Sequence, residues 1–200
     1  MLICIPDISG FTKFMSENDK GLSSKVIPSL LNDIIYSNEI GLKVSEIEGD
    51  AVLFFKQDEL PSITELMAQC SKFYLNFYAK LKVLGHRLEG IEGSDDLAKA
   101  LGLKIICHLG TDIEAVTIGK HIKLMGEDVI IAHKLLKNNI ESDDYVLLSE
   151  SLYSKYSEQQ LQEAIDWTNE IKDGDYEYEH IGIKHFKYID LKSLRVKKAM

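Results

Sequence analysis

Helical and β-prone segments alternate along this chain, and most of the β-prone segments come in adjacent pairs. Apolar residues recur at helical spacing in Val26–Ile40, from Pro61 to about Leu84, and in Gly126–Asn138. Paired β-prone runs joined by short turns favour antiparallel hairpins between the helices. Such an order is typical of an α+β sandwich rather than of a doubly wound parallel sheet. The expected strands are Leu2–Pro6, Leu42–Ile47 paired with Ala51–Phe55, Leu103–Leu109 paired with Ala115–Ile118, Tyr145–Leu148, and a terminal hairpin within Tyr176–Leu191.

The composition is that of a globular protein. The chain has 200 residues, of which 45% are hydrophobic and 28% charged, and we expect residues 1–200 to form one domain. Its net charge of −9 argues against a nucleic-acid partner, which would require a basic face. No window approaches the roughly 18 to 20 apolar residues that cross a bilayer, so no membrane association is expected.

Cysteine usage and the N-terminus indicate the compartment. Cys4, Cys70 and Cys107 lack any CxxC spacing, and two of them lie in apolar runs, as buried free thiols do in a reducing environment. The N-terminal residues lack the basic and apolar stretches of a signal peptide. We therefore expect a cytoplasmic protein.

The first candidate site lies at the end of the first strand, in the run Asp7-Ile8-Ser9-Gly10-Phe11-Thr12. A carboxylate followed by Ser-Gly and a helix start places a metal ligand beside free backbone N–H groups, which favour phosphate oxygens. Gly10 would allow an anion to approach the backbone closely. The alternative is that Asp7 simply caps the following helix.

The second candidate site is the tip of the first hairpin, Glu48-Gly49-Asp50. If this hairpin lies beside the first strand, Asp7 and Asp50 converge on one point. Two carboxylates and a backbone carbonyl make a hard-oxygen site suited to Mg²⁺ or Mn²⁺. The alternative is that Asp50 is an ordinary turn residue.

Four segments, in order along the chain, resemble motifs of the class III adenylate and guanylate cyclases. Asp7–Thr12 resembles the first metal motif, and Glu46–Ala51 resembles the hairpin that carries the second metal aspartate. Leu103–Gly110 is similar to the strand that ends in His-x-Gly, and Met125–Leu135 is similar to the segment that opens the dimer-interface helix. The closing hairpin, from Glu179, is also similar. The segment GEDVIIAHKLLKN suggests an uncharacterised, catalytically divergent bacterial branch of this family.

This resemblance implies a ferredoxin-like βαββαβ core of the nucleotidyl cyclase type, with an additional C-terminal hairpin. It also implies that Asp7, Asp50 and the Ile8 carbonyl hold two Mg²⁺ or Mn²⁺ ions, which activate the ribose 3′-hydroxyl and clamp the α-phosphate of GTP or ATP. The backbone N–H groups of Gly10, Phe11 and Thr12 would hold the phosphates. The active site of this family forms between two subunits, so a head-to-tail homodimer is implied.

Two further positions would read the base. Glu46 falls where the family reads the purine, and Lys123 falls at the partner position by its spacing before Gly126. A glutamate can accept from guanine N1–H and the 2-amino group, and a lysine can donate to O6. Alternatively, Glu46 and Lys123 form a salt bridge with each other across an unused pocket.

The remaining positions depart from the family. Its ribose-positioning asparagine aligns with Ile130, which makes no hydrogen bond, and its transition-state arginine aligns with Lys134. Lysine keeps the positive charge of this catalytic position but lacks the bidentate fork of arginine. The loss of one preorganised transition-state contact typically costs about 10²–10³ in rate. A one-residue shift of the alignment would instead bring His133 into the pocket.

Three functions therefore stay open from the sequence. The first is a metal- and nucleotide-binding homologue, weak or degenerate in catalysis and possibly regulatory. The second is an active cyclase that forms a 3′,5′-cyclic nucleotide and pyrophosphate. The third is a dimerisation or interaction scaffold without a ligand.

Overall fold

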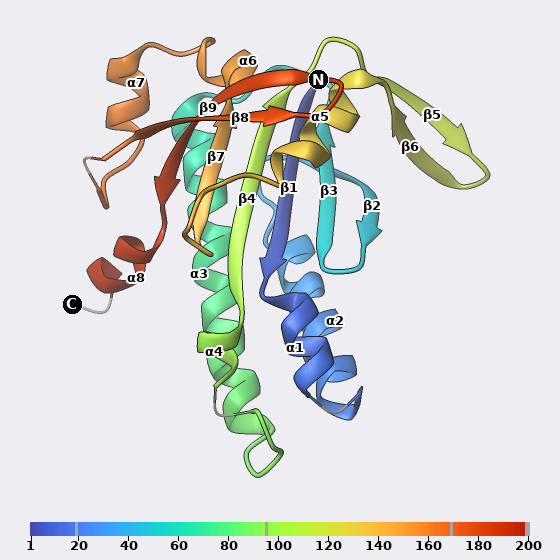
Figure 1. Ribbon diagram of the computed structural model, residues 1–200, viewed down its shortest axis with the longest axis vertical. Helices are drawn as coiled ribbons and strands as arrows, with labels where there is room; N and C mark the ends of the chain where they lie inside the picture. The colour runs from blue at the N-terminus through green and yellow to red at the C-terminus, as the bar shows by residue number, and fades with distance from the viewer. Residues whose placement is uncertain (19, 95, 169, 199–200) are drawn as a thin grey trace.

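The computed structural model describes residues 1–18, 20–94, 96–168 and 170–198. A seven-stranded sheet with the order β2-β3-β1-β4-β7-β9-β8 forms its centre, and β5 and β6 form a separate hairpin (Figure 1). The strands are β1 (Leu2–Ser9), β2 (Lys43–Glu48), β3 (Ala51–Lys56), β4 (Gly102–Leu109), β5 (Glu114–Ile118), β6 (His121–Met125), β7 (Tyr145–Ser149), β8 (Lys172–Tyr178) and β9 (Gly182–Asp190). The helices are α1 (Phe11–Glu17), α2 (Lys20–Tyr36), α3 (Ile63–Arg87), α4 (Leu97–Ala100), α5 (Glu127–Leu135), α6 (Glu150–Tyr153), α7 (Glu158–Glu163) and α8 (Lys192–Lys198).

The first half of the chain forms the expected ferredoxin-like core. Strand β1 is followed by two helices, the β2–β3 hairpin, the long helix α3 and β4, and these four strands pair antiparallel throughout. Strand β7 then pairs parallel to β4, and the predicted C-terminal hairpin adds β9 and β8 at the edge. The α+β fold class predicted from the order of elements is confirmed.

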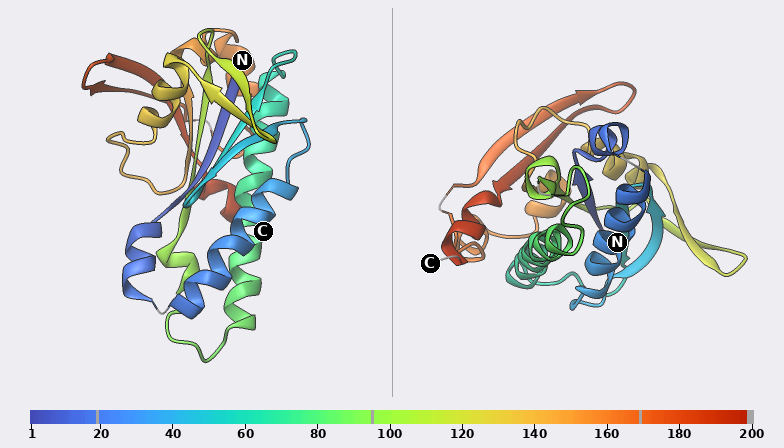
Figure 2. Two further views of the ribbon diagram at one scale, coloured as in Figure 1. Left: turned by 90° about the vertical axis from the view of Figure 1, so that its right-hand side faces the viewer. Right: turned by 90° about the horizontal axis from the view of Figure 1, so that it is seen from below.

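The two faces of the sheet are buried against different helices. Helices α2 and α3 cover one face and α5 covers the other, as the edge-on view in Figure 2 shows. Along β1, Cys4 and Ile8 point to the α2–α3 face, whereas Ile3 and Ile5 point to the α5 face. Asp7 has the same parity as Ile3 and Ile5, so its side chain belongs to the α5 face.

Several predicted boundaries and pairings were wrong. Strand β1 continues through Ser9 rather than ending at Pro6, and α2 covers Lys20–Tyr36 rather than Val26–Ile40. The predicted hairpin of Leu103–Leu109 with Ala115–Ile118 does not form, because β1 and β7 already occupy both sides of β4. Instead β5 pairs with β6, which the sequence reading missed together with α7 and α8.

The helices extend well beyond one end of the sheet (Figure 1). There α1, α2, the C-terminal half of α3 and α4 form a projection, while the β5–β6 hairpin forms an arm beside β2. Among the described residues, every helix is too short or too polar to cross a lipid bilayer.

Helix α3, the longest element, begins with a complete capping box. The Ser62 hydroxyl accepts from the Glu65 backbone N–H at 3.2 Å, and the Glu65 carboxylate accepts from the Ser62 backbone N–H at 2.9 Å. We expect Ser62→Ala to lower the free energy of unfolding by about 1 kcal/mol, because it leaves a helix N–H without its acceptor. Urea denaturation measures the loss, with Ser24→Ala on the exposed surface of α2 as the control. Equal stability of the two variants would contradict the prediction.

Candidate metal and phosphate site

The fold brings Asp7 and Asp50 together. In the antiparallel pairing of β1 with β3, Asp7 lies opposite Ala51, the residue that follows Asp50. The two-residue turn Gly49-Asp50 is tied to β1 because the Ile8 backbone N–H donates to the Asp50 carbonyl at 3.0 Å. Two acids that are 43 positions apart (50 − 7) thus lie at one end of the same strand pair.

The charges of the two carboxylates interact. Asp7 is only 8% exposed. Burial, and then the negative charge of Asp7, raise the pKa of Asp50 above its ordinary value. A pair of neighbouring acids in which one resists ionisation is a group that a cation would stabilise.

A residue that the sequence reading did not identify completes this cluster. The ammonium group of Lys104, on β4, lies 3.0 Å from Asp7 Oδ2, because Lys104 and Asp7 are register partners. Its Nζ also lies 3.4 Å from the Leu136 carbonyl. Burial alone would lower the pKa of Lys104, but the charge of Asp7 and their hydrogen bond outweigh it and raise that pKa. The sequence feature that could have identified it is a lysine within the mainly apolar run that forms β4.

The donor set fits a hard divalent cation. Two carboxylates provide anionic oxygens, and the Asp50 carbonyl, which accepts from the Ile8 N–H, belongs to the same turn. The Ile8 carbonyl, the third predicted ligand, follows Asp7 directly on β1. Within the described ranges, no group of three or more His, Cys, Asp or Glu side chains is arranged to hold a metal ion. A cation here would therefore depend on the two acids, backbone carbonyls and water, in competition with Lys104 for one oxygen of Asp7.

The predicted phosphate loop, Gly10, Phe11 and Thr12, forms the start of α1 directly after β1. Gly10 adopts φ +79° and precedes the helix. A Cβ at Gly10 would lie 2.1 Å from the Ala100 carbonyl oxygen. The backbone at Gly10 therefore packs closely against the chain's own backbone just before β4. The sequence analysis had assigned this close contact to an anion.

Glu46 and Lys123 meet across β2 and β6. The Lys123 Nζ lies 3.2 Å from Glu46 Oε2, and the Ser45 hydroxyl donates to the Ile122 carbonyl at 3.1 Å. These residues line a pocket of about 630 Å³ whose other walls are aliphatic side chains of β2, β5 and β6. The salt bridge that the sequence reading gave as an alternative is therefore present.

Helix α5 carries the remaining predicted residues. Ile130 is exposed, and Lys134 lies one turn further along on the same side of the helix. His133 lies beside the turn that carries Asp50, with its Nδ1 3.8 Å from Glu48 Oε2. Among the described residues of one chain, Lys134 forms neither a hydrogen bond nor an ion pair with Asp7 or Asp50.

His108 joins three elements behind α5. Its Nδ1 lies 2.9 Å from the Ser149 hydroxyl at the end of β7, and its Nε2 lies 3.0 Å from Asp128 Oδ1 on α5. The other carboxylate oxygen of Asp128 accepts from the backbone N–H groups of Thr111 and Asp112 at 2.7 and 2.8 Å. This network fixes the start of α5 relative to β4 and β7, which is the structural role expected for a buried histidine.

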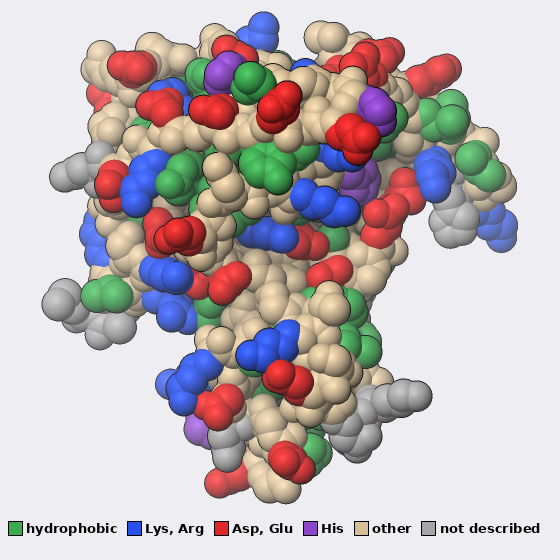
Figure 3. Space-filling model, viewed as in Figure 1, with side chains coloured by type: hydrophobic (Ala, Val, Ile, Leu, Met, Phe, Trp, Pro, Cys, Tyr) green, Lys and Arg blue, Asp and Glu red, His purple; other side chains and the backbone are tan. Residues whose placement is uncertain are grey.

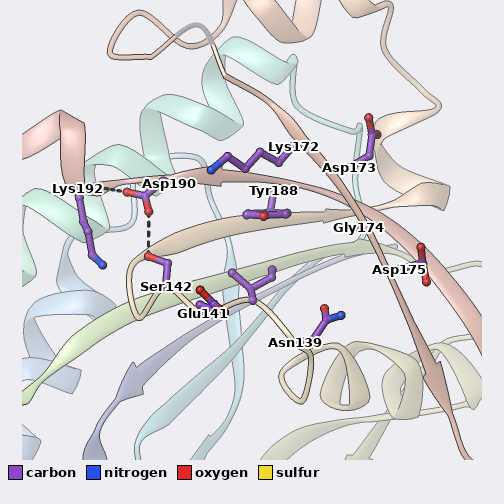
Figure 4. A pocket seen from close by; sticks show the side chains of 11 residues that line it. Asn139, Glu141, Ser142, Lys172, Asp173, Gly174, Asp175, Tyr188, Asp190 and Lys192 are labelled. Atoms are coloured by element: carbon purple, nitrogen blue, oxygen red, sulfur yellow. Dashed lines mark hydrogen bonds between the residues drawn. The ribbon is translucent and has the colours of Figure 1, made fainter.

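A larger pocket lies away from these residues. It has a volume of about 720 Å³, opens between the β8–β9 hairpin and the segment before β7, and is mainly polar. Figure 4 shows Asp190 in it, bonded to the Ser142 hydroxyl at 2.9 Å and to the Lys192 backbone at 2.7 Å. On the face shown in Figure 3, acidic and basic side chains are interspersed.

Comparison with known proteins places the chain in a family. Residues 27–145, more than half of the chain, match a family model described as "Protein of unknown function (DUF2652)". The chain belongs to this family. Among curated proteins, none matches the sequence.

The fold is that of solved class III cyclases. The adenylyl cyclase CyaB from P. aeruginosa is similar with a TM-score of 0.64 and 16% identity, over 94% of this chain and 93% of that one. The guanylyl cyclase Cya2 is similar with a TM-score of 0.59 and 16% identity, over 94% and 89% of the two chains. A "Class III adenylyl cyclase-like ATP-binding protein" from Pseudomonas aeruginosa has a TM-score of 0.60 and 19% identity, over 79% of this chain and 35% of that one. At these identities the likeness shows a shared fold.

The raised pKa of Asp50 has a consequence for stability. Because burial and Asp7 oppose its ionisation in the folded state, the charge of Asp50 destabilises the protein at pH 7. We expect Asp50→Asn to raise the melting temperature at pH 7 in the presence of EDTA. Asp58→Asn, an exposed change after β3, serves as the control. A melting temperature of Asp50→Asn at or below that of the native protein would contradict the convergence of the two acids.

The lowered pKa of His108 predicts a pH dependence. Burial is the largest cause and lowers this pKa; the hydrogen bond and charge of Asp128 raise it, and Lys184 and the N-terminus lower it further. In the unfolded chain, histidine titrates near pH 6.5, at about its ordinary pKa. As the pH falls below that value, the unfolded state binds the proton first, so the stability falls through this window.

We expect the melting temperature of the native protein to fall more steeply between pH 7.5 and pH 5.5 than that of His108→Gln. Differential scanning calorimetry over this range measures the two slopes. His86→Gln, on the exposed side of α3, should keep the native slope. An unchanged slope in His108→Gln would contradict the prediction.

Proposed function

We propose that this chain is a nucleotidyl cyclase-like domain that binds a divalent cation, Mg²⁺ or Mn²⁺, together with a nucleoside triphosphate, either GTP or ATP. We propose further that its catalysis is weak or degenerate and that it acts as a regulatory module. The observation that carries this proposal is the convergence of Asp7 and Asp50 at the start of α1. A site with no ligand would gain nothing from holding two acids whose charges oppose each other.

A divalent cation would supply the positive charge that the two acids lack and would join them to a triphosphate. A divalent cation bound to the two acids would polarise the α-phosphate and lower the pKa of the ribose 3′-hydroxyl. Lys104 would contribute a fixed positive charge beside the phosphates, and the N–H groups of Gly10, Phe11 and Thr12 would donate to their oxygens. Similar solved structures include the ATP-binding protein named above and a guanylate cyclase domain in complex with GTP, which supports a triphosphate as the ligand.

The second half of the site would come from a second copy of the chain, arranged head to tail. Large apolar side chains on β2, the β5–β6 arm and α5 are between 41% and 56% exposed, and exposed apolar side chains in number are typical of protein interfaces. These are Ile47, Ile118, Ile122, Met125 and Ile130. In a dimer formed through this surface, Glu46 and Lys123 of one copy would read the base, and its Lys134 would face the phosphates held by the other.

Weak catalysis follows from α5. Ile130 offers no hydrogen bond to a ribose, and Lys134 provides a point charge where a planar fork suits phosphate oxygens better. Losses of this kind cost about 10²–10³ in rate for each contact. We therefore expect binding without efficient turnover; efficient cyclisation is the alternative.

A thermal-shift experiment tests binding. A ligand at 100 times its Kd raises the free energy of unfolding by about 2.7 kcal/mol. For a protein of this size, each kcal/mol raises the melting temperature by about 2–4 °C. We expect GTP or ATP with Mn²⁺ to raise the melting temperature of the native protein but not of Asp7→Ala or Asp50→Ala. Asp58→Ala should keep the native shift. An unchanged shift in both site variants would place the ligand elsewhere, and no shift in the native protein would favour the scaffold function.

Product analysis then separates a binder from an enzyme. Purified protein is incubated with GTP or ATP and Mn²⁺, and cyclic nucleotide and pyrophosphate are quantified. We expect product near background. Rapid formation of both products, reduced in Lys134→Ala, would favour the active cyclase.

A further inference from the structure

A second pocket lies in the helical projection, apart from the acids of β1 and the β2–β3 turn. It has a volume of about 590 Å³ and is lined by residues of α3, the segment before α4, α4 and α8. This volume is within the usual range of small-molecule sites, about 300–1,000 Å³. The pocket shares no residue with the proposed triphosphate site, so it needs its own explanation.

The walls of this pocket are mainly apolar. Leu81 of α3 and Leu97 of α4 are almost fully buried, and Ala98 lies on the open side. Gly85 allows the segment before α4 to approach α3, because a Cβ there would already lie 3.3 Å from the Ser94 carbonyl oxygen. Such walls suit an aliphatic or aromatic group.

The rim carries positive charge. Lys82 and Arg195 both line the opening, with His86 beside them and Glu89 as an acidic neighbour. The guanidinium carbon of Arg195 lies 3.8 Å from the centre of the Tyr78 ring, which fixes it as part of the wall. Tyr78 is itself held by its hydroxyl, which lies 2.9 Å from both carboxylate oxygens of Asp144. In a chain with a net charge of −9, two cations at one apolar opening favour an anionic ligand.

A buried hydroxyl points to the same conclusion. Ser94 lines the pocket and is 1% exposed, yet its Oγ has no hydrogen-bond partner among the described residues. Buried polar atoms are nearly always paired, so an unpaired one beside a pocket indicates a missing partner. The hydroxyl is covered in this conformation, so a ligand oxygen would reach it after a change of the Ser94 rotamer.

We propose that this pocket binds a small amphipathic anion, of the class of a carboxylate with an apolar tail. The tail lies against Leu81 and Leu97, and the anionic head meets Lys82 and Arg195, with Ser94 as a hydrogen-bond donor. The ligand would bridge α3, α4 and the C-terminal helix α8.

The test uses two probes with the same tail and opposite heads, octanoate and octylamine. Each is titrated into the native protein, and the methyl signals of Leu81, Leu97 and Ala98 are followed by NMR. We expect octanoate to shift these methyl signals and to bind about tenfold more weakly to Lys82→Glu or Arg195→Glu, the change that loss of one charge contact of 1.4 kcal/mol produces. Octylamine should show the reverse order.

Both altered side chains are exposed, so the variants should fold. Arg87→Glu, a charge reversal on α3 outside the pocket, should bind octanoate as the native protein does, and Ala98→Trp should abolish binding by filling the opening. The proposal is overturned if octanoate leaves these methyl signals unmoved, or if native protein and both charge reversals bind it equally. Neither result bears on GTP or ATP binding at Asp7 and Asp50.

Discussion

The antiparallel pairing of β1 with β3 and β4 determines everything else about the candidate site. One register places Asp7 opposite Ala51, and the other places it opposite Lys104. A shift of one residue in either pairing would move the facing side chain to the α2–α3 side of the sheet, into an apolar core. The alternation of buried aliphatic residues on both faces therefore specifies the cluster of two acids and one lysine as strictly as it specifies the core.

Much of this arrangement could be predicted from the sequence, because its signals are local. The run from Asp7 to Thr12 and the turn Gly49-Asp50 are short motifs, and the order of helices and hairpins is enough to favour an α+β fold. The alternation in the last segment favoured the terminal hairpin, whereas the ferredoxin-like core was implied by the resemblance to the class III cyclases. In these parts, the residues that make up the sequence motif are neighbours along the chain and also make up the structural feature.

The parts that were missed depend on pairings between distant segments. Gly110-Thr111-Asp112 predicts a turn, but a turn alone does not determine which strands pair on either side of it. Both edges of β4 are occupied by β1 and β7, so β5 pairs with β6 instead. Lys104 was overlooked for the same reason, since its position beside Asp7 exists only through the β1–β4 register. Gly10 was assigned to an approaching anion, yet the atom that requires a glycine there is the Ala100 carbonyl oxygen.

The two ion pairs near the candidate site differ in how easily a ligand could open them. The side chains of Asp7 and Lys104 are 12% and 23% exposed, so removing either partner would leave a poorly solvated charge. In the second pair, Lys123 is 51% exposed but Glu46 is only 19% exposed, so the lysine can leave readily whereas the carboxylate would stay largely buried. A base could therefore displace Lys123 only if it donates hydrogen bonds to the Glu46 carboxylate in its place, whereas a cation at Asp7 must be accommodated with Lys104 still present. It follows that the Glu46–Lys123 ion pair selects for a base that offers N–H donors to Glu46, and that Lys104 constrains how many metal ions can bind beside Asp7.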